Sequence, residues 1–129
     1  MASTSDIISQ GIPRTLFNQL VRDAIRIFHH AGEENDLISQ ADYMRMMKAL
    51  PASRVLAKYD DRGESCEVSL ARVLRFANSE GWIKRGRQLH YEITELGVKM
   101  RAQVKESFDN IMSDIYLERF EEVQGEVRV

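Results

Sequence analysis

The first long stretch of regularly spaced apolar residues predicts a helix. From Leu16 to Phe28, apolar side chains recur every three or four positions, which is the spacing of one helical face. Pro13 suits the first turn of this helix, because the N–H that proline lacks has no partner there. Gly32 favours its end. The polar stretch 1–12 shows no such spacing and is expected to be a mobile arm.

The next apolar positions predict two shorter helices. Ser39, followed three residues later by Asp42, is typical of a capping box that opens a helix. This helix should run to Leu50, since Pro51 disfavours the helical conformation at the residue before it. Ser53 is the expected cap of a short third helix.

A fourth helix is expected over about residues 66–80, and Gly81 favours its end. Four apolar positions at i, i+3, i+4 and i+7 give it one buried face: Leu70, Val73, Leu74 and Ala77. Ser69, Arg72 and Arg75 fall largely on other faces of the helix. We therefore expect these three side chains to face water or a ligand.

A β-hairpin should follow this helix. Residues 82–85 are interpreted as one strand and residues 89–93 as the other, with Gly86 and Arg87 as a tight turn between them. In the second strand, apolar and polar residues alternate, as expected for a strand with one buried face. Its apolar residues are Leu89, Tyr91 and Ile93.

The C-terminal third of the chain predicts one long helix over 94–123, capped by Thr94 and followed by a frayed tail at 124–129. A helix of about 28 residues would be about 42 Å long, which is more than a small domain covers. We therefore expect it to pack against a second copy of the chain, although it could also wrap its own domain. The expected dimerisation residues are Phe17, Met100, Val104, Phe108, Ile111 and Ile115.

Charge is unevenly distributed along the 129 residues, whose formal net charge is −2. Residues 1–50 carry five basic and six acidic side chains, residues 51–93 eight and six, and residues 94–129 five and eight. Residues 68–90 contain five basic side chains and a single acidic one, Glu80. Local clustering of this kind is what phosphate binding requires, although such a cluster can also be no more than a solvated surface.

Several function classes are not favoured. The single cysteine, Cys66, excludes an internal disulfide framework, and His29 with His30 lacks the further ligands of a zinc site. No apolar run approaches the ~18 residues of a membrane span, and the N-terminus does not have the pattern of a secretory signal. No pair of residues has the spacing of a nucleophile and its base, so we expect a protein that is not an enzyme. We also expect it to be cytoplasmic and to use no metal or cofactor.

Two motifs give the chain a recognisable pattern. Four apolar positions lie 11, 8, 7 and 4 residues before Gly81, which two apolar residues follow. The later run Tyr91-Glu-Ile-Thr94-Glu-Leu-Gly97 is similar to a Tyr-x-Leu-Thr-x-x-Gly motif that closes the wing of winged-helix domains. In these features residues 66–97 resemble the winged-helix domains of MarR and PadR transcriptional regulators, although the wing is short. The resemblance implies a mainly α fold with a small β-hairpin wing, in which long N- and C-terminal helices form a dimer interface.

The resemblance also implies a function, namely sequence-specific binding of double-stranded DNA by a homodimer. The recognition helix, about 66–80, would enter the major groove, and the wing, 82–93, would contact the backbone or minor groove. Arg72 is the best expected base reader, because its guanidinium matches the two acceptors of guanine. The expected DNA-binding residues are Ser69, Arg72, Arg75, Lys84, Arg85 and Arg87. Secondary phosphate contacts are expected from Arg54, Lys58 and Arg62.

These expectations divide the chain into an arm (1–12), a winged-helix domain (13–93), a dimerisation helix (94–123) and a tail (124–129). The main alternative is a winged helix that serves as a protein-interaction module, or as part of a DNA-segregation or phage assembly. A small-molecule effector and a protein partner both stay open. The acidic C-terminal third favours the protein-interaction alternative modestly.

Overall fold

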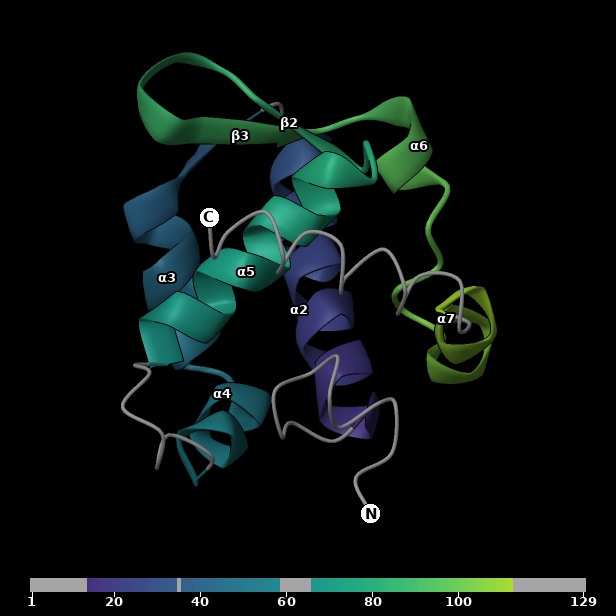
Figure 1. Cartoon of the computed structure of the whole chain (residues 1–129). Helices are drawn as coiled ribbons and strands as arrows, with labels where there is room; N and C mark the ends of the chain where they lie inside the picture. The colour runs from purple at the N-terminus through teal and green to yellow at the C-terminus, as the bar shows by residue number, and fades with distance from the viewer. Residues whose placement is uncertain (1–13, 35, 59–65, 113–129) are drawn as a thin grey trace.

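The computed structural model of the chain describes residues 14–34, 36–58 and 66–112. In chain order the elements are α2 (Arg14–Glu33), β1 (Ile38–Ser39), α3 (Gln40–Lys48), α4 (Pro51–Leu56), α5 (Cys66–Ser79), β2 (Ile83–Arg85), the 3₁₀ turn Arg87–Leu89, β3 (His90–Ile93), α6 (Glu95–Val98) and α7 (Lys105–Ile111). Helices dominate and the small sheet is antiparallel, so the α+β class expected from the sequence is confirmed (Figure 1). No helix in these ranges has the length and apolarity to span a membrane.

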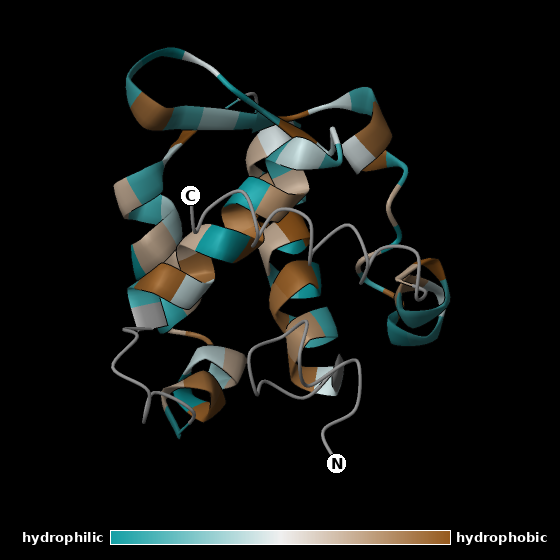
Figure 2. Ribbon diagram, viewed as in Figure 1, coloured by the Kyte–Doolittle hydropathy of each residue, from teal (hydrophilic) through white to brown (hydrophobic). Residues whose placement is uncertain are grey.

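Helix α2 is the centre of the core and contacts α3, α4, α5, β3, α6 and α7. Its apolar positions alternate with polar ones along the ribbon, as expected for a helix with one buried side (Figure 2). An aromatic cluster joins it to α5 and the hairpin: the ring of Phe76 lies 5.7 Å from that of Phe17 and 5.4 Å from that of Trp82. These contacts hold α5 and the hairpin in a defined orientation on α2.

The capping predictions for the middle helices are confirmed in one case and wrong in the other. The hydroxyl of Ser39 accepts a hydrogen bond from the Asp42 amide, at 3.1 Å, and so caps α3. Ser53, in contrast, lies inside α4 and is buried. Pro51 opens that helix instead, after Leu50 in an extended conformation, because proline needs no N–H partner in a first helical turn.

The sheet contains a strand that the sequence did not predict. Its order is β1–β3–β2, with Ile38 opposite Tyr91 and Ile83 opposite Ile93. A strand of two residues is too short to show alternation, so only its pairing with β3 reveals it. Strand β1 leads directly into α3, and this connection places α3 beside the hairpin.

The hairpin turn is wider than the Gly86–Arg87 turn that was expected. Gln88 and Leu89 both have a positive φ, of 51° and 58°, and β3 begins only at His90. The amide of Gly86 closes the turn by donating to the His90 carbonyl at 2.6 Å. Leu89 is therefore exposed in the turn rather than buried in the strand, which corrects its predicted position.

The prediction of one long C-terminal helix is wrong over its first half. Thr94 caps α6 as expected, accepting a hydrogen bond from the Gly97 amide. That helix ends at Val98, and α7 begins only at Lys105. Between these two helices Met100 and Ala102 are buried, so the chain turns back onto its own core. Burial of these side chains outweighs the continuation of a helix that already contains a glycine.

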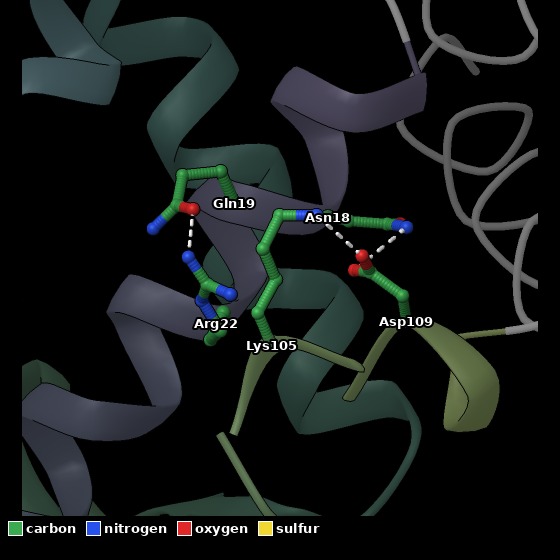
Figure 3. Close-up of polar contacts among 5 residues, drawn as sticks. All are labelled: Asn18, Gln19, Arg22, Lys105 and Asp109. Carbon is green, nitrogen blue, oxygen red and sulfur yellow. Dashed lines mark hydrogen bonds and ion pairs between the residues drawn. The ribbon is translucent and has the colours of Figure 1, made fainter. Parts of the chain in front are cut away.

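Helix α7 packs on α2 of the same chain. The side-chain amide of Asn18 donates to Asp109 at 3.4 Å, and Lys105 forms an ion pair with the same carboxylate at 2.8 Å (Figure 3). Next to this contact Phe108 is fully buried. The alternative in which this segment wraps its own domain therefore holds for residues 95–112.

The predicted dimerisation residues do not form one exposed face. Phe17, Met100 and Phe108 are buried within the core, and Ile111 is half-buried against it. Val104 is exposed, and Ile115 lies outside the described residues. A face that is already packed against its own domain is not available to a second copy, so this interface is not retained.

Candidate nucleic-acid interface

Helix α3, helix α5 and the hairpin turn surround an open hollow of about 480 Å³. Its lining comes from all three elements: Gln40, Ala41, Met44, Glu67, Val68, Ala71, Arg75 and Leu89. In Figure 1 the hairpin turn and α3 lie on the same side of the molecule, and α7 lies on the opposite side. The surface predicted to meet DNA is therefore assembled from segments that are far apart in the sequence.

The exposed stripe of α5 differs from the predicted one. Arg75 is exposed, as expected. Val68 is 41% exposed and lies seven residues earlier, which places it on the same face of the helix as Arg75. Ser69 is half-buried, and Arg72 has only 8% of its surface exposed. The expectation that Arg72 faces water or a ligand is therefore wrong.

The burial of Arg72 follows from Phe76, one turn later on the same helix. The sequence interpretation assigned four residues to the buried face of α5 and left Phe76 out. Phe76 is fully buried between Phe17 and Trp82, so the buried face is wider than assumed and includes position 72. An aromatic residue of this size next to the apolar stripe was the signal available in the sequence.

The three basic side chains of the β2–β3 hairpin are exposed, and one of them forms an ion pair. Lys84 lies opposite Glu92 across the two strands and forms an ion pair with it at 2.8 Å. The hydrogen bond and the attraction of that carboxylate raise the pKa of Lys84, so the lysine stays charged. Arg85 and Arg87 are also exposed, and within the described residues neither has a carboxylate within ion-pair distance.

The acidic residue in the hollow is neutralised by a neighbour. Glu67, at the start of α5, forms an ion pair with Lys48 at the end of α3. From the sequence, Glu67 is expected to be a first-turn acidic residue that interacts favourably with the helix dipole, although it could also accept a hydrogen bond from cytosine and would repel phosphate. The sequence did not single out Lys48. With this pair formed, the lining of the hollow has Arg75 as its remaining charged side chain.

The secondary phosphate candidates lie on and after α4. Arg54 is exposed within α4, and Lys58 is exposed just after it. Arg62 lies outside the described residues. The two described cations are thus available to solvent near the end of the molecule that α4 occupies, away from the hairpin (Figure 1).

No protein-family model matches this chain, and no curated protein or solved structure shows significant similarity to it. Among the described residues, no group of three His, Cys, Asp or Glu side chains is arranged to hold a metal ion. What the surface does must therefore be inferred from its own side chains.

Proposed function

We propose that this chain is a winged-helix module that binds double-stranded DNA and acts as a transcriptional regulator. Helix α5 would lie in the major groove, and the β2–β3 hairpin would contact the flanking backbone or minor groove. The observation that carries the proposal is the placement of Arg75, Arg85 and Arg87. All three are exposed on α5 and the hairpin, and none has a carboxylate partner among the described residues.

The residues proposed to read DNA differ from those that the sequence suggested. With Arg72 buried, Arg75 is the arginine of α5 that can reach a guanine edge or a phosphate. Val68, on the same exposed stripe, has the apolar character that suits a thymine methyl group. Lys84 is a weaker candidate than Arg85 or Arg87, because DNA binding would compete with its ion pair to Glu92.

The proposed affinity rests largely on phosphate contacts. Arg85 and Arg87 would contact one part of the backbone, and Arg54 with Lys58 another. One copy supplies only a few cations, so its affinity should depend on salt with a shallow slope. A homodimer, which would double these contacts, stays a prediction, and light scattering at micromolar concentration tests it directly: a mass of one chain would contradict it.

The test is duplex binding measured by fluorescence anisotropy over a range of salt concentrations. We expect the double variant Arg85→Ala/Arg87→Ala to bind about tenfold more weakly at low salt. It should also reduce the slope of log K against log salt by about 2 per chain, because two phosphate contacts are lost. Arg101→Ala is the matched control, since Arg101 is exposed between α6 and α7, away from the hairpin turn.

Two results would contradict DNA binding. One is wild-type protein that shows no salt-dependent association with any duplex at low ionic strength. The other is a double variant that binds as tightly as the Arg101→Ala control. A selection of preferred sequences from a random DNA pool would then show whether binding is specific, and a two-fold symmetric consensus would also indicate a dimer.

A protein-interaction module is the second candidate, and one observation favours it. Val68 and Leu89 line the same hollow and are 41% and 43% exposed, so the centre of this surface is apolar. Apolar side chains in a hollow with a polar rim are typical of protein interfaces. A stable complex with a partner protein that retains no DNA, and that Leu89→Ala weakens, would support this candidate over the first.

A further inference from the structure

A second and larger hollow lies on the other side of α3. It has a volume of about 650 Å³ and is bounded by the C-terminal half of α2, the segment 36–38, α3 with Leu50 after it, and Gln103 from the segment between α6 and α7. Helix α3 separates the two hollows, because Met44 lines the one beside α5 whereas Met46 lines this one. A volume of this size is in the range of sites that hold organic molecules of drug size. We refer to it below as the α2–α3 hollow.

The α2–α3 hollow combines apolar surface with negative charge. Its apolar lining is Ile27, Ala31, Leu37, Ile38, Met46 and Leu50. Leu37 is 52% exposed, so an apolar ligand in the hollow would bury apolar surface that is otherwise in contact with water. Five carboxylates also line the hollow, namely Asp23, Glu33, Glu34, Asp36 and Asp42, against one arginine, Arg26. Asp42 forms an ion pair with Arg45 at 3.0 Å, and Glu34 lies 3.8 Å from the imidazole of His30. Glu33 and Asp36 are exposed and have no ion-pair partner among the described residues, so the negative charge still exceeds the positive charge. His29 and His30 complete the titratable groups that line it.

Asp23 gives this hollow a buried negative charge. Only 8% of the residue is exposed, and one carboxylate oxygen accepts a hydrogen bond from the Gln19 side-chain amide at 2.7 Å. Burial raises the pKa of Asp23 despite this hydrogen bond and the nearby Arg22 and Arg26. A cation in the hollow would offset part of this cost, because an opposite charge nearby stabilises the ionised carboxylate.

We propose that the α2–α3 hollow binds a small organic cation with an apolar body. The apolar lining would cover the body of the ligand, and the surplus of carboxylates would select its positive charge. The same surplus of negative charge disfavours two other occupants. A nucleic-acid phosphate would be repelled, and a second copy docked isologously would bring its own carboxylates against these. This site goes beyond the proposed DNA binding and does not depend on it.

The probe for this proposal is tetraphenylphosphonium, with tetraphenylborate as an anion of nearly the same shape. Each is titrated into the ¹⁵N-labelled full chain, without DNA, and amide chemical shifts are followed. We expect saturable binding of the cation in the micromolar range, with shifts concentrated in residues 23–50 and around Gln103. Tetraphenylborate should bind at least about tenfold more weakly, because the lining carries the opposite charge preference.

Matched variants distinguish binding in the α2–α3 hollow from nonspecific binding elsewhere on the surface. Leu37→Ala should weaken binding of the cation about three- to tenfold, whereas Val104→Ala, a control of nearly equal exposure outside the hollow, should leave it unchanged. Asp36→Asn should weaken it about threefold, and Glu106→Gln should not. The proposal is overturned if the cation does not saturate below millimolar concentration, if the two ions bind equally, or if the shifts lie outside residues 23–50 and the neighbourhood of Gln103.

Discussion

The α-carbon of Gly97, in α6, lies directly against the backbone carbonyl of Trp82, at the start of the hairpin. A Cβ at position 97 would overlap the Trp82 carbonyl oxygen and lie 2.9 Å from the carbonyl carbon. The amide of Thr94 donates to the same carbonyl at 3.0 Å. The absence of a side chain at Gly97 thus lets α6 pack closely against the base of the β2–β3 hairpin.

This close approach predicts the effect of a single methyl group. Gly97→Ala should lower the free energy of unfolding by about 1–3 kcal/mol, because backbone atoms must move to relieve the overlap. The control is Gly86→Ala, since a Cβ there would lie at an ordinary 3.6 Å from the His90 carbonyl. Guanidinium unfolding should show the control within about 0.5 kcal/mol of wild type. Equal effects of the two variants would contradict this description of α6.

The packing of α7 predicts a large effect for Phe108. Phe108→Ala should cost about 3–5 kcal/mol, as expected when a fully buried aromatic side chain is removed from a core. Val104→Ala, four residues earlier and 53% exposed, should change stability by less than about 0.5 kcal/mol. Both effects should be independent of protein concentration. A loss of stability that shrinks as the concentration rises would instead indicate that Phe108 packs between two copies.

Asp23 predicts a pH dependence of stability. Because burial raises its folded-state pKa above the ordinary aspartate value, the folded chain holds this proton more tightly than the unfolded chain. Between the unfolded and the folded pKa, the contribution of Asp23 to stability therefore falls as the pH rises. Asp23→Asn should stabilise the protein above the folded pKa, and this gain should decrease as the pH falls through that value. Thermal unfolding measured from acidic to neutral pH checks this, and a gain that grows on acidification would contradict it.

Several elements could be predicted from the sequence because their signals are local. The helix over 14–33, the caps at Ser39 and Thr94 and the end of α5 shortly before Gly81 all follow from spacing or from one residue and its near neighbours. The exposed cations Arg75, Arg85 and Arg87 were also found in this way. Their role in binding DNA stays a prediction.

The errors concern residues whose position depends on distant contacts. Arg72 was expected to face solvent, because its charge and its position in the helical repeat are the signals that the local sequence provides. Its burial instead depends on the packing of Phe76 against Phe17 and Trp82. The long C-terminal helix was expected because its apolar seam is regular. The break between α6 and α7 depends on the contact of Gly97 with Trp82 and on the burial of Met100.

The sequence by itself determined the order of the helices α2 to α5 and of the hairpin after them, together with the clustering of positive charge, because these features follow from near neighbours in the chain. Tertiary structure alone decided which side chains share a surface. It paired Lys48 with Glu67, brought α3, α5 and Leu89 around one hollow, and placed the carboxylates of α2 and α3 around another. These groups of side chains are brought together by packing between segments far apart in the chain. The free energy of that packing cannot be inferred from the spacing of residues within any one segment.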